Sequence, residues 1–449
     1  MKTQERPIGK WRQRIGYGSS DFACNLIWQM ISLYLLYFYT NVMKLDAGAI
    51  ALMFLITKFI DGVTDLIVGM LIDKTHTRWG KSRPWILFGA VPFALFAFLA
   101  FNVPDFSMTG KIVYAYITYS LLSLSYTVVN IPMASILPAL TDDAQERTNL
   151  ATTRICFSSV GSTIVSSLAL PLVAFFGRGN EAVGFKRVML IFGIVGALVF
   201  FFTFFNTRET NLRESNEKVN ILKNLKVLVS NGPWRLFALN IVWFFGGYII
   251  QLGAIVYYFT YNLNNQALAS VAATITTLVP LAANLTVPFL TKKLIKRNVM
   301  QLGGAIQIAG ILLIFFSGQN VTPAMVGVAI SAIGSGLRQT VYFSMQPDPV
   351  DYSEWKTGVN IAGTLSAVNG FIGKVAMALA SSLSALLLGW GGFNADSAVQ
   401  SASALTSISA MYIWIPIAFI IFDMITMSFY NLDKQYPQMM KELEERNLR

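Results

Sequence analysis

Long apolar windows recur along the whole chain and are separated by short polar connections. Residues 22–39, 85–101, 188–205 and 408–422 are examples, and each approaches the roughly 20 residues that cross a bilayer as a helix. Such windows predict helices, because lipid offers the backbone no hydrogen-bond partners. We expect an all-α integral membrane protein with about twelve transmembrane helices. The predicted spans are residues 20–43, 47–72, 84–103, 112–139, 149–175, 187–206, 234–261, 267–290, 299–317, 322–345, 358–389 and 404–430.

The amino-acid composition excludes an ordinary soluble protein. Of the 449 residues, 54% are hydrophobic and only 13% are charged. A basic N-terminal segment, residues 1–18, precedes a long apolar window that further windows follow at once, so we expect a retained first helix and not a cleaved signal peptide. Cys24 and Cys156 both fall inside predicted spans, which predicts neither a disulfide nor a zinc site.

The net charge of +11 comes from basic residues gathered in the connections between spans. Because no soluble domain presents them, they do not predict nucleic-acid binding. Most fall in the N-terminus, the even-numbered connections and the C-terminus, which the positive-inside rule assigns to the cytoplasm. We therefore expect a multi-pass protein of the plasma or inner membrane with both termini cytoplasmic. The opposite connections contain only Lys44, Lys111, Arg178, Lys186 and Arg187.

A polar connection divides the predicted spans into two halves. We expect an N-terminal six-helix half at 1–206, a cytoplasmic central loop at 207–231, a C-terminal six-helix half at 232–432 and a cytoplasmic tail at 433–449. A basic loop follows the second span of each half, which suggests duplication. Two parallel six-helix halves are the arrangement of the major facilitator fold, whose substrate site lies near the midplane.

Several ionisable side chains fall at predicted membrane depth, where they cost at least a few kcal/mol and usually mark a pathway. Lys58, Asp61 and Asp65 are spaced by three and four residues, so they share one face of the second span. Two carboxylates one turn apart repel when both are ionised, so this pair can take up a proton or a small hard cation. A purely structural Lys–Asp pair is the alternative. The whole set is Asp21, Lys58, Asp61, Asp65, Arg154, Arg338, Lys374 and Asp423.

Asp21 and Arg154 fall in the first and fifth spans. A carboxylate and a guanidinium can bind vicinal sugar hydroxyls from both the acceptor and the donor side. Lys374 adds a positive charge from the eleventh span, and the ring of Tyr126 can stack on a pyranose face. A salt bridge between helices is the alternative for the charged residues.

Arg338 and Asp423 have no evident partner in the sequence. They are either pathway residues or residues near helix ends whose side chains reach the lipid headgroups. The sequence does not decide between these two interpretations.

Signatures of catalysis are absent from the sequence. The only histidine is His76, so neither a Ser-His-Asp triad nor a histidine metal site can form. The phosphate-binding pattern Gly-x-x-x-x-Gly-Lys-Ser/Thr is absent, which argues against an ATP-driven pump. We expect a transporter driven by an ion gradient, without a cofactor, and not an enzyme.

Five stretches of the chain carry a family resemblance. They are IGYGSSD at 15–21, DGVTD at 61–65, TRWGKSRPW at 77–85, YTVVNIP at 126–132 and DPVDYSEWKTG at 348–358. Together and in this order they resemble the glycoside–pentoside–hexuronide:cation symporter family, a branch of the major facilitator superfamily that includes the melibiose and glucuronide carriers. The resemblance covers most of the chain.

The resemblance implies where the coupling cation binds. Asp61 and Asp65, with Lys58 on the same face, fall where the family holds its cation, and the coupling ion is H+ or Na+. The span-four position that is aspartate in the melibiose-carrier branch is Asn130 here. The missing carboxylate weakens a sodium site, so we expect H+ in preference to Na+, with Na+ at Asp61 and Asp65 as the alternative. Ala134, where that branch has tryptophan, argues against melibiose itself.

The resemblance also implies a sugar site and a gate. Asp21 and Arg154 fall where the family binds sugar, and Lys374 falls at the position of its span-eleven lysine, near both. A further set of charged residues falls at the cytoplasmic end, where charge pairs between the halves would close an inner gate; solvated loop charges are the alternative. That set is Arg147, Asp348, Asp351 and Glu354.

These observations predict a secondary active transporter that imports a glucuronide, pentoside or other glycoside in symport with a cation, by alternating access. A carrier of an amphipathic lipid and a non-transporting membrane sensor are the alternatives. A lipid carrier predicts an apolar cavity, whereas the candidate cavity residues are charged. A sensor predicts an appended signalling domain, for which the tail at 432–449 is too short. We expect a functional monomer.

Overall fold

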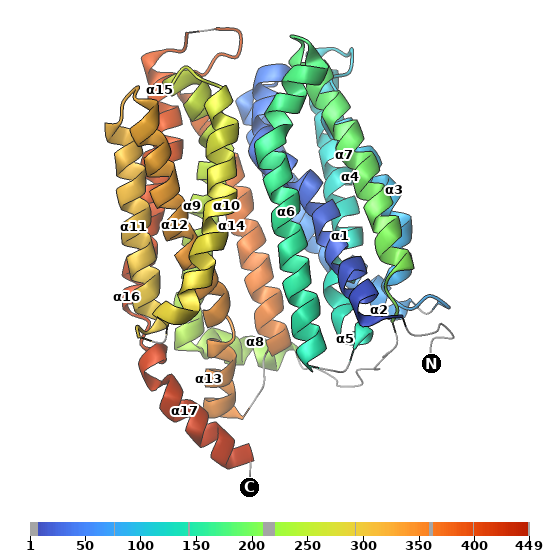
Figure 1. The fold of residues 1–449 in the computed structure, drawn as a ribbon, viewed down its shortest axis with the longest axis vertical. Coiled ribbons are helices and arrows are strands. Elements are labelled where there is room, and N and C mark those ends of the chain that lie inside the picture. The colour runs from blue at the N-terminus through green and yellow to red at the C-terminus, as the bar shows by residue number, and fades with distance from the viewer. Residues whose placement is uncertain are drawn as a thin grey trace. The chain divides into compact units, whose positions relative to one another are not determined.

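The computed structural model describes residues 8–75, 77–141, 144–209, 221–291, 293–358, 362–397 and 399–447. These residues are almost entirely helical and form no β-strand, which confirms the predicted all-α fold (Figure 1). By contacts, the chain divides into two compact units. The first consists of Met1–Ser215, Gln266–Thr274 and Leu388–Ser401, and the second of Asn216–Asn265, Ile275–Leu387 and Ala402–Arg449. The halves predicted from the sequence, with their loop and tail boundaries, stay a prediction.

The helices follow one another through short connections. Those of residues 1–215 are α1 (Lys10–Met30), continued by the π-helical turns η1 (Ile31–Leu35) and η2 (Phe38–Val42), then α2 (Ala47–Lys74), α3 (Arg83–Ala100), α4 (Met108–Ser135), α5 (Leu137–Leu140), α6 (Ala144–Gly177) and α7 (Glu181–Phe205). Then come α8 (Ile221–Ser230), α9 (Gly232–Tyr257) with η3 (Tyr258–Asn262), α10 (Ala267–Leu290), α11 (Lys296–Phe316), α12 (Val321–Met345), α13 (Asp348–Thr357), α14 (Ala362–Trp390), α15 (Ala402–Ser409), η4 (Ala410–Trp414), α16 (Ile415–Ser428) and α17 (Leu432–Asn447).

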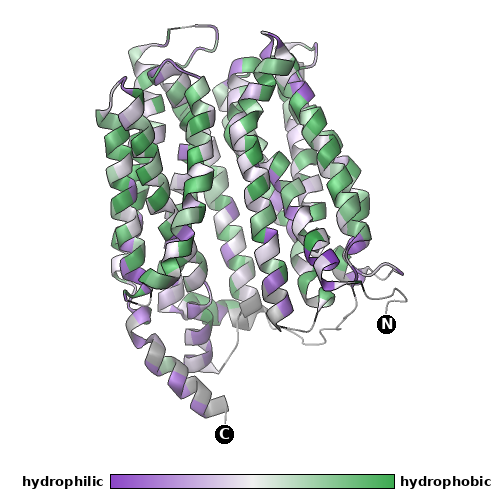
Figure 2. Ribbon diagram, viewed as in Figure 1, coloured by the Kyte–Doolittle hydropathy of each residue, from purple (hydrophilic) through white to green (hydrophobic). Residues whose placement is uncertain are grey.

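Apolar side chains cover the outer surface of the long helices, which is the opposite of a soluble fold. Phe59 and Phe316 are each 77% exposed and Leu285 is 74% exposed. Such a surface needs an apolar solvent. Figure 2 shows hydrophobic residues along the long helices and hydrophilic residues over α13 and α17.

Ten helical segments in the described part of the chain are long and apolar enough to cross a membrane. They are Arg83–Ala100, Met108–Ser135, Asn149–Gly177, Glu181–Phe205, Gly232–Asn262, Ala267–Val287, Lys296–Phe316, Val321–Thr357, Thr364–Trp390 and Ala402–Ser428. The other two expected spans lie in α1 to η2 and in α2, and these helices carry Asp21, Lys58, Asp61 and Asp65. The protein is therefore a multi-pass membrane protein, and the exact number of twelve spans stays a prediction.

Several helices begin at a side-chain cap. Asp46, Ser107, Asn180 and Asn231 each accept a hydrogen bond from the backbone N–H three residues later, at the start of α2, α4, α7 and α9. Such a cap satisfies one of the N–H groups that the first helical turn leaves unpaired.

Helix α1 begins at Lys10, before the predicted span at 20–43. Its polar first turns are helical because partners are available to them. Gln13 donates to the backbone oxygen of Leu140, and Arg14 donates two hydrogen bonds to the carboxylate of Glu146. Hydropathy marks only the part of a helix that lies in lipid, so it misses these turns.

A distant carboxylate caps α3. Glu209, which is 1% exposed, accepts hydrogen bonds from the backbone N–H groups of Lys81, Ser82 and Arg83 at 2.8, 2.8 and 2.9 Å. Gly80 has φ +108°, and a Cβ there would lie 2.5 Å from the Glu209 carboxyl carbon. The glycine of the TRWGKSRPW motif is thus required for this contact.

The other unit contains a matching contact. Asp433, which follows α16, accepts a 2.7 Å hydrogen bond from the backbone N–H of Arg297 in the first turn of α11. Burial raises the pKa of Asp433 above its usual value. An acid after one helix therefore caps the start of an earlier helix in each unit, as duplication would produce.

Candidate functional site

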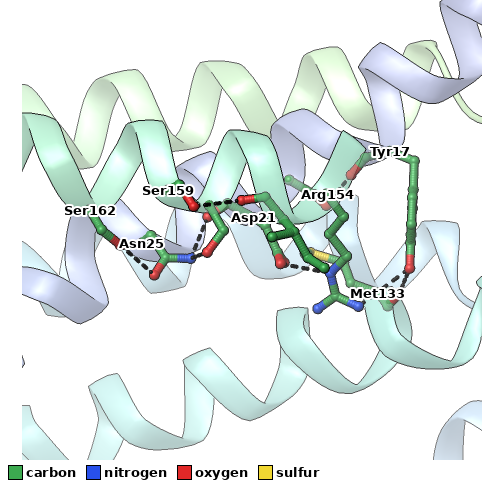
Figure 3. A network of polar contacts seen from close by, with 10 residues as sticks. Tyr17, Asp21, Asn25, Met133, Arg154, Ser159 and Ser162 are labelled. Carbon is green, nitrogen blue, oxygen red and sulfur yellow. Dashed lines mark hydrogen bonds and ion pairs between the residues drawn. The ribbon is translucent and has the colours of Figure 1, made fainter. Parts of the chain in front are cut away.

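Helices α1 and α6 bring Asp21 and Arg154 together (Figure 3). The Arg154 Nε lies 2.7 Å from the Asp21 Oδ2, and the two side chains remain 23% and 16% exposed. Arg154 also donates to the hydroxyl of Tyr17 at 3.3 Å, and Tyr17 donates to the backbone oxygen of Met133. The pair is both a salt bridge between helices and an accessible donor and acceptor set. Its role in binding sugar stays a prediction.

The two helices pack closely enough for this contact because small residues line their interface. A Cβ added to Gly18 would lie 2.7 Å from the Thr153 Cγ2, and one added to Gly161 would lie 2.9 Å from the Phe22 backbone oxygen. Small residues let transmembrane helices approach each other in this way.

A second polar contact lies one turn further along both helices, and the sequence reasoning missed it. Asn25 donates to the Ser158 Oγ and to the Asp21 backbone oxygen, both at 2.8 Å, and accepts from the Ser162 Oγ at 3.1 Å. The labelled side chains in Figure 3 show this line of contacts. The signal was present in the sequence, since polar residues recur every fourth position on both helices. The series is Tyr17, Asp21, Asn25 and Gln29 on α1, and Arg154, Ser158, Ser162 and Ser166 on α6.

Three of the four predicted cation-binding residues, Lys58, Asp61 and Asp65, lie on α2. The Lys58 Nζ lies 3.0 Å from the Asp61 Oδ2, so the expected ion pair is present. The other carboxylate oxygen of Asp61, Oδ1, is buried and has no hydrogen-bond partner in the described structure. Asp65 accepts a 2.9 Å hydrogen bond from the Thr127 hydroxyl of α4. Thr127 is a further oxygen beside the site that the sequence reasoning did not name.

Helix α4 links the two groups of charged residues. The Tyr126 ring stacks on the Trp28 ring of α1 with centroids 5.1 Å apart. The Lys58 ammonium lies 5.1 Å from the centroid of the same Trp28 ring. Asn130 is half-buried and lies one turn after Tyr126 and Thr127 on α4. The Tyr126 ring is therefore already stacked on a ring of the protein.

The donor set bears on which ion can bind. Among the described residues, no group of three or more His, Cys, Asp or Glu side chains is arranged to hold a metal ion. Asp61, Asp65 and Thr127 provide oxygen atoms, which are the ligands of a small hard cation, and a carboxylate is also a proton acceptor.

The remaining predicted residues lie on other helices. Lys374 is half-buried on α14 in the second unit. Asp348 accepts from the Lys296 Nζ at 2.8 and 2.9 Å, and Asp351 accepts from the Tyr436 hydroxyl at 2.6 Å, both within the second unit. Glu354 lies on the same helix, α13. The side chain of Arg147 lies outside the described residues, so the inner gate stays a prediction.

Arg338 and Asp423 correct one reading of the sequence. The Arg338 Nη2 donates to the Asp423 Oδ2 at 2.8 Å, and the side chains are only 4% and 1% exposed. They are partners of each other, so the interpretation that they reach the lipid headgroups is wrong. Sequence alone missed the pair because its members lie on different helices.

The fold and the charged groups inside it define a polytopic membrane carrier. Comparison with known proteins agrees: a family model described as MFS/sugar transport protein matches residues 16–434. The chain belongs to this family, which confirms the resemblance drawn from the five motifs. It is a transporter and not an enzyme.

Three similar proteins illustrate the match. The chain is 38% identical to an isoprimeverose transporter of Lactiplantibacillus pentosus, covering 97% of this chain and 92% of the relative. It is 32% identical to a putative glycoside/cation symporter, YagG, of Escherichia coli, covering 94% and 92%. The crystal structure of a nucleoside transporter matches with a TM-score of 0.70 at 13% identity, covering 92% of this chain and 99% of that one, which shows the shared fold alone.

Proposed function

We propose that the protein imports a sugar or glycoside in symport with a cation by alternating access. The observation that carries this proposal is the connection inside the first unit between two groups of charges. The Trp28 ring contacts Lys58 of the predicted cation site. The Tyr126 ring stacks on Trp28. The next residue on α4, Thr127, donates a hydrogen bond to Asp65. Trp28 lies on α1, the helix that also carries Asp21, so we infer that a ligand at one group changes the surroundings of the other.

Such a connection is what coupling requires. A cation and a sugar that each favour the other's binding share a coupling free energy, which is reciprocal between the two sites. The names of the relatives, an isoprimeverose transporter and a glycoside/cation symporter, support a glycoside as the solute.

We assign Asp61 and Asp65 to the cation, with Lys58 and Asn130 beside them, and Asp21 and Arg154 to the sugar. Because Asn130 replaces a carboxylate, H+ is the preferred coupling ion over Na+. The unpartnered Oδ1 of Asp61 is the group that receives the ion. Lys374 on α14 contributes a positive charge to the sugar site.

We place the protein in the cell membrane with both termini in the cytoplasm, where the positive-inside rule puts the basic connections. The inner gate formed by Arg147, Asp348, Asp351 and Glu354 belongs to the same proposal. It requires that Asp348 and Asp351 exchange their present partners during the cycle.

Uptake into proteoliposomes tests the proposal. Labelled glucuronides, galactosides and xylosides are offered under an imposed pH gradient or an imposed sodium gradient. Accumulation of one solute under one gradient supports the proposal and identifies the ion. No accumulation of any sugar under either gradient contradicts it and favours a lipid carrier or a sensor.

A further inference from the structure

The second unit contains a buried polar network that the proposed transport mechanism does not use. Arg338 on α12 donates to the Gln307 Oε1 of α11 at 2.6 Å and to the Asp423 Oδ2 of α16 at 2.8 Å. Asn240 on α9 donates to the Asp423 Oδ1. Arg338 and Asp423 are 3% and 1% exposed. Four helices therefore meet at one compensated ion pair.

Stability alone does not explain such a pair. Desolvating two charges costs several kcal/mol per ion, and replacing a buried pair by apolar residues of similar volume is often neutral or stabilising. Removing one partner alone, in contrast, leaves a buried charge uncompensated and is strongly destabilising.

The pair fixes the orientation of Gln307. A carboxamide has one acceptor end and one donor end, and Arg338 occupies the acceptor end. The Nε2 of Gln307 has no hydrogen-bond partner in the described part of the chain, so its two N–H groups are available on the other side of the carboxamide.

Gln307 also lines a cavity of about 40 Å³ between α9, α10, α11, α12 and η4. Ser331, 6% exposed, and Ser335 line it too, and neither hydroxyl has a hydrogen-bond partner among the described residues. Gln251 donates its Nε2 to the Tyr412 backbone oxygen, which leaves its Oε1 as an acceptor at the same cavity. The cavity thus offers donors, an acceptor and hydroxyls without any charge in its lining.

A neutral O–H group fits this chemistry and size. A cavity needs about 10–15 Å³ to hold a water, so this one of about 40 Å³ takes about three waters or one hydroxymethyl group, and it is too small for a sugar ring. Water and a sugar hydroxyl have the same hydrogen-bonding chemistry. They can be distinguished by experiment, because removing the site changes the affinity for the sugar only if the cavity binds a sugar hydroxyl.

We propose that the cavity lined by Gln307 and Ser331 is a hydroxyl-binding pocket for one substituent of the carried sugar, and that Arg338, neutralised by Asp423, is the positioning residue that presents the Gln307 amide to it. This inference rests on the proposed sugar transport. It adds to that function a specificity-determining site in the second unit.

The test compares variants in proteoliposome uptake and in thermal unfolding. The double substitution Arg338→Met with Asp423→Leu removes both charges at similar volume, so we expect folding to be retained while the Gln307 amide is released. We expect the KM for the sugar to rise about tenfold, the effect of losing about 1.4 kcal/mol of binding, with the maximal rate retained. Asp423→Leu alone should lower the unfolding temperature far more than the double substitution does.

A second variant leaves the ion pair untouched. Ser331→Ala removes one hydroxyl from the cavity, and Ser344→Ala, on the same helix but with its Oγ bonded to the Val341 oxygen, is the matched control. We expect a several-fold higher KM for Ser331→Ala and an unchanged KM for the control.

The outcomes separate the two proposals. A wild-type KM in both Ser331→Ala and the double variant would show a pair that only supports the fold and a cavity that holds only water, and would overturn this inference while leaving sugar transport intact. A wild-type protein that transports no sugar would overturn the proposed function and this inference with it.

Discussion

Asp61→Asn is the substitution that most directly separates coupling from transport. Asp61 is 5% exposed in the middle of α2, with one carboxylate oxygen on Lys58 and the other without a partner. Asparagine keeps the size and an oxygen for Lys58. It cannot take up a proton or neutralise a cation, so the solute can still move but no ion moves with it.

The expected loss of solute accumulation can be calculated from the one ion that the Asp61 site carries. One positive charge crossing a membrane at 100 mV delivers about 2.3 kcal/mol. At about 1.4 kcal/mol per tenfold, this supports roughly 50-fold accumulation of the solute. We expect Asp61→Asn to reduce the accumulation ratio to about 1, while exchange of labelled for unlabelled sugar keeps a substantial rate.

The assay measures both quantities on the same proteoliposomes. Asp105→Asn, the same chemical change in an exposed connection, is the control and should accumulate like the wild type. Undiminished accumulation by Asp61→Asn under both a proton and a sodium gradient would refute the assignment of Asp61 to the cation.

Three further predictions concern the contacts of the first unit. Arg154→Lys removes the planar fork, so we expect sugar affinity to fall at least tenfold in a binding assay while the protein stays folded; unchanged affinity would remove Arg154 from the site. Asn25→Ala removes the hydrogen bonds that cross from α1 to α6, and should cost about 1 kcal/mol in thermal unfolding; an unchanged unfolding temperature would show that the contacts contribute nothing. The hydrogen-bonded guanidinium of Arg14 lowers the pKa of Glu146, so their contribution is present above the unfolded pKa of about 4.3 and is lost as pH falls through the folded value. Glu146→Gln should therefore flatten the acid side of the unfolding-temperature profile, and an unaltered profile would contradict the reasoning.

The fold was predictable because lipid imposes strong constraints. A helix that crosses lipid must be apolar over most of its length, so windows of hydropathy locate α3, α11 and α12 within a few residues. The first turns of α1 were not predictable in this way. They are polar, and they are helical because Leu140 and Glu146 of distant segments accept their hydrogen bonds.

The candidate site was predictable in its charges and not in its neutral partners. Charges such as Asp21 and Arg154 are conspicuous at membrane depth because they are costly there. Asn25 and Thr127 carry no such cost. The four-residue polar spacing on α1 indicates Asn25, but nothing in the sequence indicates Thr127. Spacing within one helix relates Lys58 to Asp61, but no sequence spacing relates residues on different helices.

The pairing of Arg338 with Asp423 illustrates that limit. The two residues lie 85 positions apart, and only the packing of α12 against its neighbours joins them. Each residue alone was recognisable as unusual in lipid, but neither indicated its partner. The role proposed for them therefore depends on the structure.

Co-movement of the ion with the sugar tests the central claim most directly. Proteoliposomes containing a pH-sensitive dye, or a sodium indicator, are given an inward sugar gradient and no imposed ion gradient. The account predicts that a transported glycoside acidifies the lumen in wild-type vesicles and that Asp61→Asn vesicles take up the same sugar without acidification. Sugar entry into wild-type vesicles with no movement of protons or sodium would contradict symport.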